Sequence, residues 1–196
     1  MLSAIVLAAG LSARMGRENK LLLPLNGKTV IEVTLQQLLE TGIEEIIVVT
    51  GYEAEKVRAA IKHLPVTIIY NSMYERGMTT SIQKGVETAT GNGYMICLAD
   101  MFAIASSEYA SIAAGFEKQL PLDRHCICIP RHKNEKGNPV IFSASYKTDI
   151  LLHREMEGCK AIIQLNKKHI RWIDMDTAHI LEDLDYPDDY KKISME

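Results

Sequence analysis

The chain has 196 residues, of which 47% are hydrophobic and 24% charged, and these proportions are typical of one globular domain with a buried core. The formal net charge of -3 includes no excess of basic residues, which argues against nucleic acid as a partner and against an electrostatically held membrane surface. The apolar run at the N-terminus has no basic residues before it, and no run reaches the ~18 apolar residues of a membrane span, so we expect a cytoplasmic protein.

Apolar runs rich in β-branched residues alternate along the chain with segments of helical periodicity. Strands are predicted, in chain order, in SAIVLAA at 3–9, EEIIVVTG at 44–51, VTIIYN at 66–71, YMICLAD at 94–100 and CICIP at 126–130. Helices are predicted between them at 29–42, 53–63, 79–88 and 106–118. Because the strand runs are almost continuously apolar, we predict an α/β protein with a mostly parallel central sheet and helices on both faces.

The first predicted helix has a capping pattern at its start. Thr29 stands where its side chain can cap the helix, and Glu32 is placed to reach back to it. The helix is expected to end near Gly42, since glycine readily adopts the conformation that follows a helix.

The predicted strands and helices become shorter after Pro139. Strands are predicted at 139–142 and 170–175, with helices at 147–153 and 160–168. Because no linker or low-complexity stretch separates these elements from the earlier ones, residues 1–196 are predicted to form a single domain.

The four cysteines are expected to be reduced thiols, since a chain without an export signal needs no disulfide framework. Cys126 and Cys128, with His132, are the candidates for a metal cluster. They lack the ligand spacing of zinc sites and belong to an apolar run that ends at Pro130, so a role in a core strand is favoured.

A loop with glycines and cations follows the first strand. It contains Gly10, Arg14, Gly16, Arg17 and Lys20, and such residues suit the binding of a triphosphate, because glycine lets the backbone approach an anion and the cations supply charge. The loop is neither a Walker A loop nor a G-x-G-x-x-G dinucleotide loop. From composition alone, a surface loop with scattered cations remains an alternative.

The segment LAAGLSARMGRENKLLLPLNGKTV at 7–30 resembles the signature of the MobA/MocA-like nucleotidyltransferases, roughly LAAGxSxRMGxxKxLLPLxGKxV. The resemblance implies a single-domain, three-layer Rossmann-like nucleotidyltransferase fold. It also implies that a nucleoside triphosphate is held by the side chains of Arg14 and Lys20 and by the backbone around Ala9 and Gly10, with Leu7 and Ala8 among the nucleotide-binding residues.

The segment ERGMTTSIQKGV at 75–86 resembles the family's G-M-x-x-S-x-x-x-G helix start. The resemblance implies that Gly77, Met78 and Ser81 face the nucleotide at a helix N-terminus, where the helix dipole favours negative charge. Plain capping by Thr79 or Thr80 is the alternative, and both interpretations can hold together.

Two acidic segments resemble metal motifs of the family. CLADMF at 97–102 places Asp100 just after an apolar strand, and ILEDLDYPDDY at 180–190 supplies Asp183 and Asp185, which face the same side if that segment is extended. Mg²⁺ needs one or two carboxylates together with substrate phosphates, so the resemblance implies a magnesium site on Asp100 and one or both of the later aspartates. The alternative is a turn in which Asp185 caps a final helix starting at Pro187.

The acceptor side departs from the family pattern. Asn138 in KGNPVIF stands where the family usually has His, and Cys159 and Ile162 stand where it usually has Asp and Arg. These departures leave the nucleotide part, residues to about 130, unaffected. They leave the acceptor open for the part from about 131 to 196.

The resemblance implies in-line attack of an acceptor phosphate on the α-phosphorus of the nucleotide, with Lys20, Arg14 and Asp100 as the catalytic residues. LAAG in the first loop favours CTP over GTP, and molybdopterin is the first acceptor implied, with a molybdoenzyme as a possible recipient. Two alternatives stay open: a sugar phosphate or another phosphorylated metabolite as the acceptor, and a non-catalytic protein that binds and delivers the molybdenum cofactor.

Overall fold

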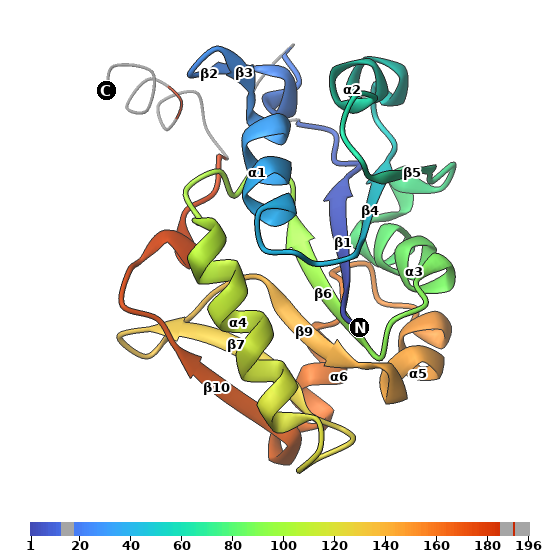
Figure 1. Cartoon of the computed structure of the whole chain (residues 1–196). Coiled ribbons are helices and arrows are strands. Elements are labelled where there is room, and N and C mark those ends of the chain that lie inside the picture. The colour runs from blue at the N-terminus through green and yellow to red at the C-terminus, as the bar shows by residue number, and fades with distance from the viewer. Residues whose placement is uncertain (13–17, 185–189, 191–196) are drawn as a thin grey trace.

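An eight-stranded sheet lies at the centre of the computed structural model, which describes residues 1–12, 18–184 and 190 (Figure 1). The strand order is β10-β7-β9-β6-β1-β4-β5, with β8 paired to β7, and β2 and β3 form a separate hairpin. The strands are β1 (Ser3–Ala8), β2 (Pro24–Leu25), β3 (Lys28–Thr29), β4 (Glu45–Thr50), β5 (Thr67–Tyr70), β6 (Gly93–Leu98), β7 (Ile127–His132), β8 (Glu135–Lys136), β9 (Val140–Ser143) and β10 (Ile170–Asp174). The sheet is mostly parallel, because only β9 and β8 run against their neighbours.

Strand β1 runs through the middle of the sheet, and its side chains divide between the two faces. It is parallel to β4 and β6, with Ile5 opposite Ile47 and Ile96. Ala4 and Val6 contribute to the hydrophobic core on one face and Ile5 to the core on the other, each with no exposed surface. This alternation explains the nearly continuous apolar sequence of the strand, since both of its faces are buried.

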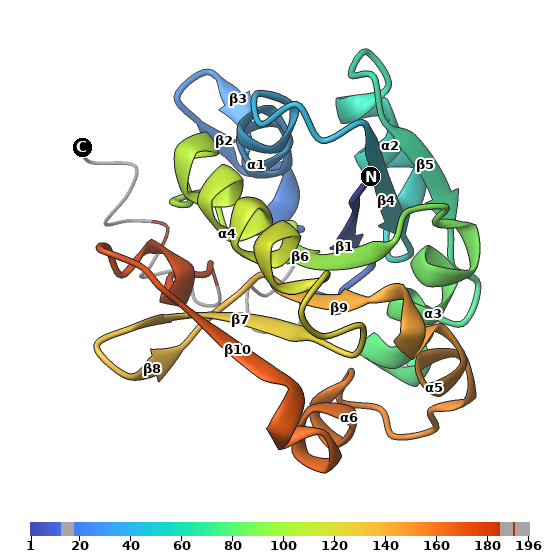
Figure 2. The same ribbon diagram turned by 60° about the horizontal axis from the view of Figure 1, so that its bottom comes forward.

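Helices cover both faces of the sheet, so the predicted three-layer arrangement is confirmed (Figure 2). The helices are α1 (Val30–Leu39), α2 (Ala54–Ile61), α3 (Met78–Thr88), α4 (Ser106–Gln119), α5 (Lys147–Leu152) and α6 (Lys160–Leu165). The core of the first face takes residues from α1, α2 and α4, including Leu35, Val57 and Ile112. The core of the second takes residues from α3, α5 and α6, among them Val86 and Ile150.

The predicted start of the first helix is confirmed. Helix α1 begins at Val30, and both the backbone N–H and the hydroxyl of Thr29 donate to the Glu32 carboxylate, at 2.8 and 2.7 Å. Glu32 therefore reaches back to the residue before the helix, as its spacing indicates.

Several predicted element ends differ from the structure by two or three residues, among them those of β7 and α6. Strand β7 continues past Pro130 to His132, which is possible because its pairing with β9 stops at Cys128 and the missing N–H of proline falls beyond that pairing. Helix α6 ends at Leu165, where the Asn166 side chain donates to the carbonyl of Ile162 and a separate 3-10 turn follows.

The β2–β3 hairpin was not predicted, although the sequence carries a signal for it. Asn26 and Gly27 connect its strands, and both have positive φ, at 52° and 78°. An Asn-Gly pair with two positive φ angles is typical of a tight hairpin turn.

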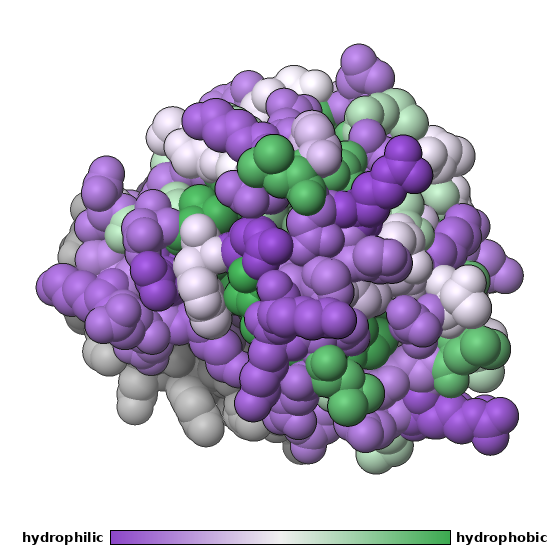
Figure 3. All heavy atoms as spheres, turned by 90° about the horizontal axis from the view of Figure 1, so that it is seen from below, coloured by the Kyte–Doolittle hydropathy of each residue, from purple (hydrophilic) through white to green (hydrophobic). Residues whose placement is uncertain are grey.

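The face at the amino ends of the strands shows hydrophobic residues in small separate groups among hydrophilic ones (Figure 3). Single exposed apolar residues of this kind are normal on protein surfaces. In the described part of the chain, no helix has both the length and the apolar composition to cross a bilayer.

Candidate active site

The chain reverses its direction of winding between β1 and β6. From β1 it passes through α1 to β4 and then to β5, on one side, whereas from β5 it returns through α3 to β6 on the other side of β1. The segments that follow β1 and β6 therefore diverge at the carboxyl ends of two adjacent strands. In open α/β sheets this switch point is where ligands bind.

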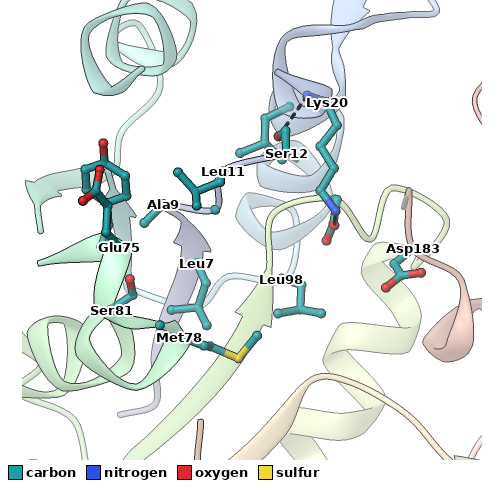
Figure 4. Close-up of a pocket in the computed structure, with 15 residues that line it drawn as sticks. Leu7, Ala9, Leu11, Ser12, Lys20, Glu75, Met78, Ser81, Leu98 and Asp183 are labelled. Atoms are coloured by element: carbon teal, nitrogen blue, oxygen red, sulfur yellow. Dashed lines mark hydrogen bonds and ion pairs between the residues drawn. The ribbon is translucent and has the colours of Figure 1, made fainter. Parts of the chain in front are cut away.

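A cavity of about 450 Å³ lies at this switch point (Figure 4). Its size is within the range of small-molecule sites. Its lining comes from the segment after β1, the start of α3, the end of β6 and the C-terminal segment: Leu7, Ala9, Gly10, Leu11, Ser12, Lys20, Leu21, Tyr74, Glu75, Gly77, Met78, Ser81, Leu98, Asp100 and Asp183.

Lys20 and Asp100 form an ion pair on one side of the cavity. Their side chains are 17% and 9% exposed. Lys20 begins a 3-10 turn capped by Asn19, whose side-chain oxygen accepts from the N–H of Leu21 at 3.1 Å, and the Lys20 N–H donates to Ser12 at 3.3 Å (Figure 4). These bonds hold the cation against the carboxylate that follows β6.

Asp183 lies on the same side of the cavity as Lys20 (Figure 4). Its neighbours on the chain fix its place, because Ile180 and Leu184 are fully buried on either side of it. Asp100 and Asp183 together offer carboxylate oxygens, the donors that Mg²⁺ prefers, and Mg²⁺ needs only one or two of them beside substrate phosphates. No cluster of three His, Cys, Asp or Glu side chains that could hold a metal ion occurs in the described ranges.

The N-terminus of α3 forms the opposite side of the cavity. Gly77 precedes the helix with φ of 99°, a conformation that side chains rarely adopt, and a Cβ there would lie 2.7 Å from the carbonyl oxygen of Met156. Only glycine fits this position. The first N–H groups of a helix can bind an anion, so this side adds polar donors to the cavity.

Asn71 orients the hydroxyl of Ser81. The Asn71 side-chain oxygen accepts from the N–H of Met73 at 3.0 Å, so its NH₂ group faces Ser81 and donates to the Ser81 hydroxyl at 3.0 Å. Both residues are almost fully buried. Ser81 accepts this hydrogen bond, and no acceptor for its own proton occurs within the described ranges. Its hydroxyl can therefore donate to a group in the cavity.

The structure brings most of the sequence-predicted site residues to this one cavity. Those that line it are Leu7, Ala9, Gly10, Lys20, Gly77, Met78, Ser81, Asp100 and Asp183. Ala8 does not line it, because alternate residues of β1 face opposite sides and its side chain is buried in the core. Arg14 and Asp185 lie outside the described residues, as do Gly16, Arg17 and Pro187.

Several lining residues were not predicted. Tyr74 directly precedes the segment 75–86 and Glu75 is its first residue, both in the 3-10 turn Tyr74–Arg76, and Leu98 ends the strand that leads to Asp100. Proximity to the motif is the signal that could have indicated them. Asn71 has no such signal, because its role comes from a contact between two elements.

Two of the three acceptor-side residues that differ from the family pattern are buried in the core. Cys159 and Ile162 are 7% and 5% exposed and belong to the hydrophobic core of the second face. Asn138 donates its backbone N–H to the carbonyl of Ile180 at 3.0 Å, which ties the segment before β9 to the segment that carries Asp183.

Comparisons with known proteins give a matching family model, sequence relatives and solved structures of similar fold. The family model described as MobA-like NTP transferase domain matches residues 4–171. The molybdenum cofactor cytidylyltransferase of Escherichia coli is 24% identical over 96% of this chain and 93% of its own. The nicotine blue oxidoreductase of Paenarthrobacter nicotinovorans is 34% identical over 50% of this chain and 48% of its own. A solved nucleotidyl transferase from Methanothermobacter superposes with a TM-score of 0.83 and 26% identity, over 98% of this chain and 95% of its own.

Proposed function

Because the chain belongs to the MobA-like NTP transferase family, we propose that it transfers CMP from CTP to a phosphorylated acceptor, with molybdopterin as the first candidate, and releases pyrophosphate. The observation that carries the proposal is the position of the Lys20–Asp100 ion pair. It lies at the topological switch point, in one cavity with Asp183 and the N-terminus of α3. A lysine cation, carboxylates and helix N–H groups in one cavity suit a metal-bound triphosphate.

The reaction follows from the chemistry of these groups. An oxygen of the acceptor phosphate forms a bond to the α-phosphorus of CTP while the bond from that phosphorus to the bridging oxygen of the β-phosphate breaks, and pyrophosphate leaves with the electron pair. The attacking phosphate oxygen is already ionised, so no protein base or nucleophile is required. Catalysis then rests on positioning and on neutralising charge.

Each proposed site residue has one task in this reaction. Asp100, with Asp183 or Asp185, would hold Mg²⁺, which when bound supplies positive charge to the phosphate oxygens. Lys20 and Arg14 would neutralise the triphosphate and the departing pyrophosphate. The backbone near Ala9 and Gly10 and the first turn of α3 would hold the nucleotide against these charges.

The proposal of CTP and molybdopterin rests on two supports. Leu7-Ala8-Ala9-Gly10 follows the LAAG form of the first loop, which favours CTP, and Ala9 lines the cavity. The E. coli relative that aligns with almost the whole chain is named a molybdenum cofactor cytidylyltransferase. One small side chain near a base usually provides about 1–3 kcal/mol of selectivity, so GTP is the nucleotide to test against CTP.

A different phosphorylated acceptor is the second candidate. Cys159 and Ile162 are buried in the core at the positions where the family usually has Asp and Arg, so this chain lacks two polar groups of the usual acceptor side. A sugar phosphate or another phosphorylated metabolite would keep the same nucleotide chemistry. A non-catalytic protein that delivers the cofactor to a molybdoenzyme would bind the same ligands without turnover.

Two measurements test the proposal. A thermal-shift panel of the four nucleoside triphosphates with and without Mg²⁺ is expected to show the largest shift for CTP with Mg²⁺, because a ligand at 100 times its Kd stabilises by about 2.7 kcal/mol. Pyrophosphate release from CTP is then expected with molybdopterin. Release only with another acceptor favours the second candidate, binding without release indicates a delivery protein, and no response to any nucleotide rejects the family activity for this chain.

A further inference from the structure

The two carboxylates of the proposed metal site come from segments that are far apart in sequence. Asp100 follows β6, whereas Asp183 follows the 3-10 turn His179–Leu181 near the C-terminus. A functional constellation needs its groups held to within about 0.5 Å, and two carboxylates of like charge repel each other. Some contact outside the cavity therefore has to fix one segment against the other.

Glu108, in the first turn of α4, makes this contact. One of its oxygens accepts from the N–H of Ala105 at 2.8 Å and from Nδ1 of His179 at 2.9 Å, and the other accepts from the hydroxyl of Thr177. Figure 1 shows the C-terminal segment in red beside this end of α4. We name this set of residues, Glu108 with Ala105, Thr177 and His179, the Glu108 clamp.

The hydrogen bonds of the clamp favour the ionised form of Glu108. The Glu108 side chain is 12% exposed, and a carboxylate can only accept, so Nδ1 of His179 carries the proton. Burial alone raises the pKa of the Glu108 carboxyl, but the hydrogen bonds from Thr177, Ala105 and His179 outweigh burial and lower the pKa below its ordinary value. Glu108 is thus held as an anion that binds both segments.

Buried side chains and hydrogen bonds hold both segments between the clamp and the cavity. On the α4 side, Met101 and Ile104 are buried between Asp100 and Ala105. On the other side, the N–H of Leu181 donates to the carbonyl of Ala178 at 2.8 Å, and Ile180 is fully buried with its carbonyl bonded to Asn138. A shift at Thr177 or His179 would therefore be passed on to Asp183.

We propose that Glu108 is a positioning residue that sets the distance between Asp183 and Asp100 and thereby the affinity of the cavity for a divalent cation. This inference rests on the proposed function. Glu108 itself does not line the cavity, so it would act on the metal through the two segments and leave nucleotide contacts unchanged.

The test measures Mn²⁺ affinity by calorimetry in the presence of α,β-methylene-CTP, which cannot release pyrophosphate. Glu108→Gln is expected to weaken Mn²⁺ binding by about tenfold, the lower end of the range for groups that orient metal ligands. The Thr177→Val, His179→Ala double variant leaves the Ala105 bond intact and is expected to have the same effect. Binding of the analogue in EDTA is expected to stay within about twofold for both, and turnover is expected to recover at high Mg²⁺.

Glu45→Gln is the matched control. Glu45 accepts from the hydroxyl of Ser3 and from the N–H and hydroxyl of Thr90, but it lies at the amino end of β4, away from the cavity. It is expected to leave Mn²⁺ affinity unchanged. If Glu45→Gln weakened Mn²⁺ binding as much as Glu108→Gln, general destabilisation would explain the effect and the inference would be overturned.

Asp100→Asn separates failure of the inference from failure of the proposed function. If Asp100→Asn abolishes Mn²⁺ binding while both clamp variants bind like the wild type, the positioning role is wrong and the metal site stands. If the wild type binds no Mn²⁺, or Asp100→Asn binds it equally well, the metal site is wrong and the positioning role fails with it.

Discussion

Lys20 and Asp100 neutralise each other in a place where both are largely shielded from water. Removing one partner of such a pair leaves an uncompensated charge, which is much more costly than losing an exposed ion pair. The same shielding makes Lys20 effective toward a triphosphate, because charge interactions strengthen as water is excluded. The residue therefore matters to both stability and the proposed chemistry.

We predict that Lys20→Ala lowers the rate of pyrophosphate release by about 10²–10³, equivalent to about 3–4 kcal/mol, because a preorganised charge is lost. Lys28→Ala is the control, since Lys28 belongs to the same signature but is exposed and bonds to Gln36. Steady-state kinetics at saturating acceptor measure both. A loss below tenfold for Lys20→Ala, with unchanged stability, would contradict the phosphate role.

The polarity of the Ser81 hydroxyl gives a second prediction at this scale. Asn71→Asp keeps the oxygen that accepts from the N–H of Met73 but has no N–H to donate. Ser81 would then donate its hydroxyl proton to the new carboxylate, and this proton would no longer be available to a ligand in the cavity. CTP affinity is expected to fall about fivefold, the value of one hydrogen bond of about 1 kcal/mol. Ser81→Ala is expected to lose a similar amount, and the double variant no more than either alone. Fully additive losses in calorimetric Kd values would argue against coupling of the two side chains.

Helix α3 links the cavity to the acceptor-side part of the chain. The hydroxyl of Thr79 donates to the carbonyl of Glu155 and accepts from the N–H of Gly158, and Gln83 donates to carbonyls near the end of α5, including His153 at 2.8 Å. Ser81, between these two, lines the cavity. One element thus fixes the nucleotide side against the segment that precedes α6.

The close packing of α3 on β1 gives a prediction at the scale of elements. A Cβ on Gly85 would lie 2.2 Å from Cγ2 of Ile5, a branch next to the backbone of a fully buried residue, whereas one on Gly115 of α4 would meet the terminal methyl of Ile173 at 2.6 Å. In an open helix, alanine is better than glycine by about 1 kcal/mol. We expect Gly85→Ala instead to destabilise by about 1–3 kcal/mol through overpacking. Gly115→Ala is expected to cost less, because Ile173 can rotate; urea unfolding measures both, and a more stable Gly85→Ala would show that α3 can move.

At the scale of the whole molecule, the two proposed functional parts share one sheet. β6, from the nucleotide part, pairs with β9, from the acceptor part, and β9 pairs with β7. The division near residue 130 therefore separates two proposed functional roles within one sheet. Asp183, from the later part, lines the nucleotide cavity.

We predict that the chain unfolds in urea as one unit. Trp172, the single tryptophan, lies on β10 and reports on the later part, whereas far-UV circular dichroism reports on all helices. The two transitions are expected to coincide and to move together to higher urea when CTP and Mg²⁺ are added. A separate transition in Trp172 fluorescence, unaffected by CTP, would indicate two independent units.

The sequence by itself determined the elements and the family. Periodicity of apolar residues located the helices and the main strands, and the signatures at 7–30, 75–86 and 97–102 pointed to residues that lie in one cavity. These features depend on neighbours along the chain, so local patterns are sufficient to reveal them.

Only the tertiary structure decided which residues meet. The ion pair of Lys20 with Asp100, the orientation of Ser81 by Asn71 and the contacts of Glu108 with Thr177 and His179 each join segments from different elements. The exclusion of Ala8 from the cavity likewise follows from the facing of β1 in the sheet. Such contacts depend on strand order and on the packing of helices against the sheet. A local sequence motif specifies neither of these.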